Sequence, residues 1–436
     1  MPAAKTAARA RPSFAVERFA LSNGLRVVVS PDPSSPVVAV AVYYDVGMRS
    51  EPAGRTGFAH LFEHMMFQGS ASLGKTEHFT HVQGSGGTLN GSTHLDYTNY
   101  YEILPSNATE LALFLEADRM RSIALTQENL ANQVAVVQNE IRVNVQNRPY
   151  GGYPWLKLPP VLYDTFANTH DGYGSFVDLE SVTIDDAAQF FDRYYAPGNA
   201  VLAVVGDVEV EQVRRWVEQH YGDIEKRATP ERDRFSEGPL TGERRHVTYD
   251  ALAPAPAVTM AWRTPDPADL TGFLPFVVLA EVLTDGDAAR LQDRMLLRDQ
   301  SVTSVGGYLG LLGDPLDARD PTPLLIDIHH PAETSADAVL ATVDEELDRL
   351  VSGGLAAQEL ARTVARMTAR YLRDLDPALG RAQQFAVFEQ QRGRAELAGE
   401  LTGLLATVTA EEVLAAASTL RPDNRAVVEL RPGAGS

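Results

Sequence analysis

The chain has 436 residues, of which 44% are hydrophobic, so it can bury more than one core and two or three domains are expected. Its formal net charge of -20 argues against a nucleic-acid partner, because no basic surface dominates to neutralise phosphates. The absence of cysteine excludes disulfides and thiolate metal sites, so any metal must be held by His, Asp or Glu.

The N-terminal segment MPAAKTAARARPSF carries charges but lacks the apolar stretch of a secretory signal. Residues 1–14 are therefore predicted to form a flexible tail. No stretch of the sequence is long and apolar enough to span a membrane. These features predict a cytoplasmic enzyme or binding protein without a membrane partner.

Valines that alternate or cluster mark the first predicted β-structure. The run RFALSNGLRVVVSPDPSSPVVAVAVYYDVG predicts two strands, with a turn at Asn23-Gly24. Further along the chain, VLAVVGDVEV predicts a strand that leads into a turn. Helices are predicted at residues 56–66, 108–123 and 127–147.

The sequences on the two sides of residues 223–245 repeat each other. This segment is polar, contains Pro and Gly, and is predicted to be a linker. SVTIDDAAQFFDRYYAPGNAVLAVVG and TVTAEEVLAAASTLRPDNRAVVELRP share a capped helix start, an apolar helix, a Pro-x-Asn turn and a closing strand. Their equivalent residues Thr183 and Thr409 lie 226 positions apart. Two copies of one α+β domain are predicted, at residues 15–222 and 246–436.

The segment GFAHLFEHMMFQGS places two histidines and a glutamate within five positions, among residues typical of a buried helix. Residues four apart lie on one face of a helix, so His60 and His64 can point at one metal ion. Glu63 lies at the edge of that face, where its carboxylate can reach a metal-bound water without ligating the metal. Chance matches to this pattern are common, so a core or surface histidine pair is the alternative.

A second candidate ligand lies on the helix predicted over residues 127–147. Glu140 stands among apolar residues, and a carboxylate at the edge of an apolar face needs a partner to offset its desolvation. Glu140 is therefore either a metal ligand or a partly exposed residue at the border of that face.

The order His-x-x-Glu-His is the inverzincin signature. The chain resembles a half-length member of the pitrilysin or insulinase-type zinc peptidases, the group that includes mitochondrial processing peptidase. In that family a glutamate far downstream supplies the third zinc ligand, and Glu140, 76 residues after His64, occupies that place. The run GGTLNGSTHLDYTNYYEILP also resembles the family's Gly-Gly-x-x-Asn-Ala-x-Thr segment, with matches at Asn90, Thr93 and Asp96.

The resemblance implies two similar domains, each a mixed β-sheet with helices packed on one side, which is an α+β fold. It also implies that one zinc ion is bound by His60, His64 and Glu140 in the first domain. Glu63 would be the general base, taking a proton from the attacking water and passing it to the leaving amine.

The resemblance further implies that the segment from Asn90 to Thr98 is an edge strand, to which an unfolded peptide substrate is added as an extra strand. Asn90 and Thr93 are accordingly the candidate substrate-binding residues, and Asn90 would hold the substrate backbone near the zinc. A turn role for Asn90, beside several glycines, is the alternative.

One position near the third ligand departs from the commonest pattern of the family. Many relatives carry a glutamate where this chain has Gln133, seven residues before Glu140. The Gln133 side chain can still form a hydrogen bond to a ligand from the second shell, but it adds no charge.

The second half of the chain departs further from the family's active-site pattern. Full active sites of the family also use an Arg and a Tyr from this half to bind substrate, and Leu296 and Thr303 fall at those positions in RLQDRMLLRDQSVTSVGGYLG. If the alignment slips, the candidate substitutes are Arg294, Arg298 and Tyr308.

Some half-length relatives work as heterodimers. The chain is therefore predicted to be the zinc subunit of a pair that cleaves unfolded or leader peptides, with a homologous partner supplying the Arg/Tyr pair. A homodimer that uses other residues is the alternative.

Two functions without catalysis remain as alternatives. A structural subunit of this family usually loses part of the zinc set, whereas His60, Glu63, His64 and Glu140 are all present here. A peptide-binding protein that holds metal without cutting would keep the edge strand and show no turnover.

Overall fold

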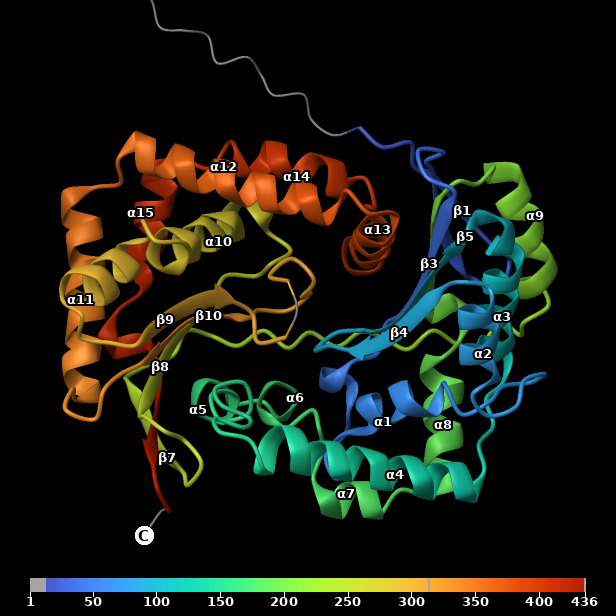
Figure 1. Ribbon diagram of the computed structural model, residues 1–436, viewed down its shortest axis with the longest axis horizontal. Coiled ribbons are helices and arrows are strands. Elements are labelled where there is room, and N and C mark those ends of the chain that lie inside the picture. The colour runs from blue at the N-terminus through green and yellow to red at the C-terminus, as the bar shows by residue number, and fades with distance from the viewer. Residues whose placement is uncertain (1–12, 313, 435–436) are drawn as a thin grey trace, which may run out of the picture.

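The computed structural model describes residues 13–312 and 314–434, so residues 1–12 of the predicted tail lie outside the described residues. It contains two β-sheets with helices packed against them (Figure 1). The strands of the first sheet are β1 Glu17–Ala20, β2 Arg26–Pro31, β3 Val37–Tyr44, β4 Thr88–Thr93, β5 Thr98–Pro105 and β6 Ala200–Gly206. The strands of the second sheet are β7 Arg244–Asp250, β8 Ala257–Arg263, β9 Ser304–Leu309, β10 Pro323–His329 and β11 Ala426–Pro432.

Fifteen α-helices are found among the described residues. Those before the second sheet are α1 Phe58–Met65, α2 Glu77–Gly84, α3 Thr109–Arg121, α4 Gln127–Ile141, α5 Pro159–Leu162, α6 Phe166–Thr169, α7 Phe176–Glu180, α8 Ile184–Tyr194 and α9 Val210–Tyr221. Those that follow are α10 Leu270–Thr284, α11 Ala336–Gly353, α12 Ala357–Asp374, α13 Ala378–Arg392, α14 Leu397–Leu405 and α15 Ala410–Thr419. Two π-helical turns occur, at Arg142–Gln146 and Gln292–Arg298.

The strand order of the two sheets is the same apart from the extra strand β1. The order β2-β6-β3-β5-β4 in the first sheet corresponds position by position to β7-β11-β8-β10-β9 in the second. The helices α8 and α15, which precede the equivalent strands β6 and β11, both begin with a capping box, at Thr183 and Thr409. The predicted α+β fold with two similar copies is therefore confirmed.

Both faces of the first sheet are covered. Along β3, Val38, Val40 and Val42 point into one core cluster, which they share with the first-half helices. The intervening residues Ala39 and Ala41 point into the other cluster, because neighbouring residues of a strand face opposite sides. On that outer face, α13 packs against β3 and β6 (Figure 1). The sheet thus has its own helices on one side, as predicted, and a second-half helix on the other.

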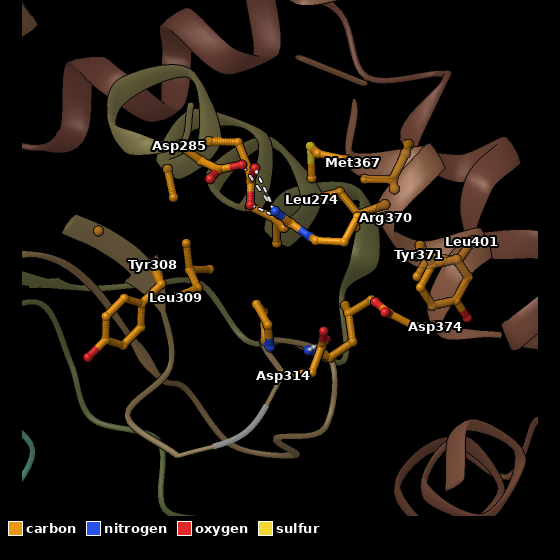
Figure 2. Close-up of a pocket in the computed structure, with 17 residues that line it drawn as sticks. Leu274, Asp285, Tyr308, Leu309, Asp314, Met367, Arg370, Tyr371, Asp374 and Leu401 are labelled. Carbon is orange, nitrogen blue, oxygen red and sulfur yellow. Dashed lines mark hydrogen bonds and ion pairs between the residues drawn. The ribbon is translucent and has the colours of Figure 1, made fainter. Parts of the chain in front are cut away.

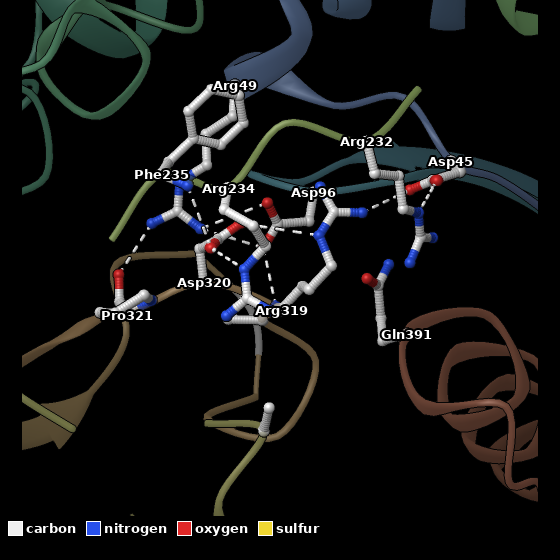
Figure 3. Close-up of polar contacts among 12 residues, drawn as sticks. Asp45, Arg49, Asp96, Arg232, Arg234, Phe235, Arg319, Asp320, Pro321 and Gln391 are labelled. Carbon is white, nitrogen blue, oxygen red and sulfur yellow. Dashed lines mark hydrogen bonds and ion pairs between the residues drawn. The ribbon is translucent and has the colours of Figure 1, made fainter. Parts of the chain in front are cut away.

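A network of ion pairs joins the two halves (Figure 3). Arg49 Nη1 lies 3.0 Å from Asp96 Oδ2, and these side chains are only 3% and 1% exposed. From the loop between β9 and β10, the backbone N–H of Arg319 donates to Asp96 and the Pro321 carbonyl accepts from Arg49. Asp320 of the same loop accepts from Arg234, which lies in the segment 225–243 that forms no helix or strand.

Two of the predicted strand assignments differ from the structure. The first predicted pair is a set of three strands, since the short polar strand β1 pairs with β2. The predicted edge strand does lie at the edge as β4, but it ends at Thr93 and residues 94–97 turn back into β5. Among the described residues, no single helix is long and apolar enough to cross a membrane, and only the bent pair α14 and α15 reaches that length and composition together.

Candidate functional site

Helix α1 carries the predicted histidines and is anchored at its start by a buried carboxylate. Glu51 accepts hydrogen bonds from the backbone N–H groups of Gly57, at 2.9 Å, and of Ala59, at 2.8 Å. Free N–H groups at a helix start favour an acceptor with negative charge. The Glu51 carboxylate also lies 3.0 Å from His170 Nε2, so it cannot leave this position without losing three partners.

The three predicted ligands converge. The Nε2 atoms of His60 and His64 lie 3.3 Å apart, and Glu140 Oε2 lies 3.6 Å from the first and 3.4 Å from the second. Zinc binds imidazole nitrogen and carboxylate oxygen at about 2.0–2.2 Å, so its tetrahedral ligands stand about 3.3–3.5 Å from one another. Two histidines and one glutamate are also a known ligand set of catalytic zinc. The residues therefore fit a zinc ion.

The protonation states of two of the three ligands, His60 and Glu140, also suit a metal. Burial and, to a smaller extent, the neighbouring His64 lower the pKa of His60 to about 4, against the opposing charge of Glu140. The pKa of Glu140 is lowered, chiefly by its hydrogen bond with His64. Burial lowers the pKa of His64, but its hydrogen bond with Glu140 and the charge of Glu63 outweigh burial, so the pKa is raised. A neutral His60 and an ionised Glu140 are the forms that bind a divalent ion.

The Glu140 side chain is oriented by hydrogen bonds to the carboxylate oxygen that does not face the histidines. Its Oε1 atom accepts from Asn144 Nδ2 and from the Tyr173 hydroxyl, both at 3.4 Å, and this leaves Oε2 for the metal. The π-helical turn Arg142–Gln146 begins directly after α4, and such turns are often found at functional sites. Glu140 thus lies in the last turn of α4, with one oxygen facing the two histidines.

Glu63 lies beside the ligands and is held by the edge strand. The Thr93 hydroxyl donates a 2.7 Å hydrogen bond to Glu63 Oε2, which leaves Oε1 free to handle a proton. Burial raises the pKa of the Glu63 carboxyl, although the Thr93 bond and His64 oppose this shift. Thr93, predicted to bind substrate, therefore also positions the candidate base.

A cavity of about 290 Å³ lies over these residues. Its walls include Trp155 and Tyr173, whose rings lie 5.3 Å apart, and Met48. Leu312, from the loop between β9 and β10, is the second-half residue that lines it. Sequence reasoning missed all four, because three come from loops and Met48 from a 3-10 helix of three residues, which are too short or irregular to show periodicity. The only local signal is that Trp155 and Tyr173 stand in Gly-rich segments.

The other two predicted site residues, Gln133 and Asn90, lie in different surroundings. Gln133 is buried on α4, donates a 3.3 Å hydrogen bond to Asn132 Oδ1, and lies close enough to His64 to raise the pKa of that imidazole, so its second-shell role stays a prediction. Asn90 is on β4 but is exposed, lies outside the cavity lining, and accepts a 2.9 Å hydrogen bond from the N–H of Gly91. Asn90 pairs with Tyr101 in the β4–β5 ladder, so it is a strand residue and not the turn residue weighed as its alternative, and its role in substrate binding stays a prediction.

None of the second-half positions considered for the Arg/Tyr pair lines the cavity. Leu296 packs against the second-half core and the Thr303 hydroxyl donates to the carbonyl of His329. Arg294 is paired with Glu345, Arg298 with Asp293, and Tyr308 lines a different cavity. Among the residues that the structure describes, the cavity lining beside Glu63 therefore includes no arginine or tyrosine of the second half.

A second cluster with metal-ligand side chains already contains an ion pair. His78, Glu102 and Glu116 are all buried and bring ligand atoms within 4.8 Å of one another. The buried Arg119 guanidinium forms an ion pair with Glu116 in the same cluster. Because this cation already engages Glu116, we place the metal centre at His60, His64 and Glu140.

Removing the third ligand gives a direct test. Glu140→Ala is expected to weaken zinc binding by at least about 100-fold, because losing outer-shell partners alone costs about 10–100-fold. Competition against a chromogenic chelator measures the affinity. The matched control is Glu128→Ala, at an exposed position in the first turn of the same helix, which should bind zinc as the parent does. Equal affinities in the two variants would contradict the assignment.

Two sequence-family models match the chain. The family described as Insulinase (Peptidase family M16) matches residues 26–150, a range that includes His60, Glu63, His64 and Glu140. The family described as Peptidase M16 inactive domain matches residues 181–367. The two models thus fall on either side of the segment between residues 150 and 181.

Proteins named zinc proteases are similar over most or about half of the chain. Zinc protease PqqE of Helicobacter pylori is 26% identical over 387 residues, which are 85% of this chain and 82% of that protein. The uncharacterized zinc protease YmxG of Bacillus subtilis is 27% identical over 208 residues, which are 46% of this chain and 49% of that protein.

Solved structures share the fold. A protease from Helicobacter pylori has a TM-score of 0.86 at 23% identity and covers 96% of this chain and 100% of its own. A peptidase M16 inactive domain from Pseudomonas fluorescens has a TM-score of 0.84 at 18% identity. The match covers 97% of this chain and 99% of that one. At these identities the likeness concerns the two-domain architecture.

Proposed function

The chain belongs to peptidase family M16, the insulinase family, and from this premise we propose that it is a zinc-dependent endopeptidase subunit that cleaves unfolded peptides. The observation that carries the proposal is the convergence of His60, His64 and Glu140, with 3.3–3.6 Å between their ligand atoms, beside a free carboxylate oxygen of Glu63. Relatives named zinc proteases support the same metal.

The chain's own residues divide the work. Zinc held by the three ligands would acidify a water molecule and polarise the scissile carbonyl. Glu63 accepts the proton of the attacking water at Oε1 and then donates it to the leaving nitrogen. Thr93 keeps Oε2 of Glu63 engaged, so the base presents one oxygen in a fixed place. Trp155, Tyr173 and Leu312 line the cavity and give it apolar walls.

An unfolded peptide is the substrate that the edge of the first sheet favours. Strand β4 is the last strand of that sheet, so its outer backbone groups can pair with an added extended chain. The residues that line the cavity include 91–93 at the end of β4, directly beside Glu63. A peptide paired with β4 would therefore pass over the metal ligands.

We propose further that a homologous subunit completes the site. Active sites that bind a peptide carbonyl need donors aimed at the oxygen as it gains charge. The cavity lining holds no arginine, and its one tyrosine, Tyr173, is already bonded to Glu140. A partner with an Arg/Tyr pair would supply the missing donors, and a leader peptide with basic residues would suit the formal charge of -20.

Hydrolysis tests the partner proposal. The zinc-loaded chain is incubated with an unfolded peptide alone and after mixing with a homologous subunit that contains the Arg/Tyr pair. We expect turnover in the mixture only, measured as new N-termini by mass spectrometry. Full turnover by the chain alone would refute the need for a partner. Zinc binding without turnover in either sample would favour a second candidate function, a subunit without catalysis.

That other candidate is a subunit without catalysis. The match of residues 181–367 to a model described as an inactive domain favours it, as does the similarity to a solved M16 inactive domain. The complete set of His60, His64 and Glu140, with Glu63 beside them, argues for the peptidase, because a purely structural subunit needs no general base.

A further inference from the structure

The second sheet has an open edge at the place where the first sheet is covered. In the first half, β1 pairs antiparallel with β2 and closes that side of the sheet. Strand β7 is the counterpart of β2 in the strand order, and among the described residues no strand pairs with its outer side. The chain before β7 does not take that place, because residues 225–243 form no strand and lead to the junction, where Arg234 binds Asp320.

The two edges of the second sheet differ in their surroundings. Strand β9 borders a cavity of about 400 Å³ whose other walls come from α10, α12 and α14 (Figure 2). Strand β7 lies at the lower left of Figure 1, near the C-terminal end of the chain, and Val247 and Tyr249 on it are 36% and 46% exposed. Within the described parts of the chain, the backbone of residues 245–249 pairs with β11 alone. An edge strand with free backbone groups and exposed apolar side chains is a template for another strand.

The charged residues at the start of β7 do not protect this edge by repulsion. Charges along an edge strand usually discourage pairing with another chain. Here Arg244 Nη1 lies 2.8 Å from Asp164 Oδ1. Arg245 forms ion pairs with Glu243 and with Asp337, both at 2.6 Å. Three carboxylates therefore offset the two arginines, and an identical strand can approach without facing an excess of positive charge.

The strand RRHVTYD is complementary to itself when two copies run antiparallel around Val247, which then faces the Val247 of the second copy. In this register Arg244 faces Asp250, a carboxylate that accepts hydrogen bonds from two backbone N–H groups and has no cation as an ion-pair partner among the described residues. Arg245 faces the exposed ring of Tyr249, which suits a cation–π contact. Opposite charges and apolar pairs directly across two strands stabilise antiparallel pairing.

We propose that β7 pairs with β7 of a second copy of this chain, antiparallel and centred on Val247. A two-fold axis would relate the two copies, and their second sheets would join into one continuous sheet. The second copy would then cover β7 as β1 covers β2 in the first half. This inference does not rest on the proposed function, because the metal ligands and edge strand β4 belong to the first half and remain available to a peptide or to a homologous subunit.

Self-association of the purified full chain, without any other subunit, provides the first test. Sedimentation equilibrium at micromolar concentrations is expected to show a monomer–dimer equilibrium for the parent. Val247→Glu and Val247→Lys should each weaken the dimer by about tenfold or more, because the residue faces its own copy and like charges directly opposite one another are destabilising. An equimolar mixture of the two variants should associate again, because Glu then faces Lys.

A cross-link tests the register. The chain contains no cysteine, so Val247→Cys introduces a single thiol per chain. Residues directly opposite each other in an antiparallel pair have Cα atoms about 4.5–5.5 Å apart, a separation that a disulfide can span. We expect mild oxidation to convert this variant to a covalent dimer. The matched control is Val351→Cys, because Val351 is 42% exposed on α11, and it should cross-link at least about tenfold more slowly.

The outcomes separate this pairing from other modes of association. Val351→Lys should associate as the parent does, and thermal unfolding of each variant establishes that the fold is kept. The proposal is overturned if the parent stays monomeric, if a folded Val247→Lys variant associates as tightly as the parent, if the Glu and Lys variants fail to associate when mixed, or if Val247→Cys cross-links no faster than Val351→Cys. A monomeric chain whose binding to a homologous subunit is weakened by Val247→Lys would also overturn it, because that subunit would then occupy the edge.

Discussion

Replacing the general base should reduce peptide hydrolysis by about 10²–10⁴-fold, the usual contribution of a positioned acid or base. Glu63→Gln keeps the size and the acceptor oxygen of the side chain but cannot take a proton. Because Glu63 is not among the three converging ligands, the variant should still bind one zinc per chain. Turnover is measured in whichever preparation is active, and zinc content is determined on the same sample.

Thr93→Val should reduce hydrolysis less than Glu63→Gln does. It removes the 2.7 Å hydrogen bond to Glu63 Oε2 but leaves the carboxylate in place. A hydrogen bond to a charged group contributes about 1.5–3 kcal/mol, so hydrolysis should fall by about 10–100-fold. Retention of more than a tenth of the parent activity by Glu63→Gln would show that another group moves the proton.

Breaking the buried pair at the junction should destabilise the protein by about 3–5 kcal/mol, since removing one partner leaves the other charge buried and unpaired. Asp96→Ala removes the carboxylate that faces the Arg49 guanidinium at 3.0 Å and also accepts from the backbone N–H of Arg319. The variant loses a contact within the first half and one between the halves. Urea denaturation followed by tryptophan fluorescence measures the change.

The pH dependence of this effect follows from the pKa of Asp96. Burial raises the pKa of this carboxyl, but Arg49 and Arg319 outweigh burial, so the pKa is lowered in the folded protein. A group of this kind stabilises the fold above its unfolded pKa of about 3.9, and the stabilisation is lost as the pH falls through the lower folded value. The difference between parent and Asp96→Ala should stay constant from about pH 5 to pH 8 and shrink below about pH 4.

An exposed pair is the control for the junction variant. Asp223 lies 2.6 Å from Arg121, but these side chains are 70% and 37% exposed. Asp223→Ala should cost less than about 1 kcal/mol, as solvent screens surface pairs. If Asp96→Ala costs no more than this control, the Arg49–Asp96 pair does not hold the junction.

The sequence predicts those site residues that lie close together in the chain, and it predicts distant ones poorly. His60, Glu63 and His64 share one helical turn, so their common face follows from helix geometry alone. Glu140 lies on another helix, and only the resemblance to a family selected it. Tyr173 and Leu312 reach the cavity from irregular loops, one of them in the other half of the chain, and no periodicity predicts such positions.

The same reasoning explains what was predictable of the fold. The repeat showed itself because capped helix starts and closing strands have strong residue preferences at Thr183 and Thr409. Strand β1 was missed because its four residues are mostly exposed and lack an apolar face. The packing of α13 on the first sheet depends on a match between small residues such as Ala39 and a distant helix, which no local pattern reveals.

The packing of α13 on the first sheet also means that the sheet is synthesised before the helix that covers it. The strands of the first sheet are complete at Gly206, whereas α13 ends at Arg392. At a synthesis rate of about 5–20 residues per second, the helix emerges about 10–40 s after the sheet that it covers. Throughout that interval the face with Ala39 and Ala41 is open to water and to other nascent chains. The first half therefore depends on a late part of its own chain, and a ribosome that stalls between the two would display an apolar surface for chaperones to bind.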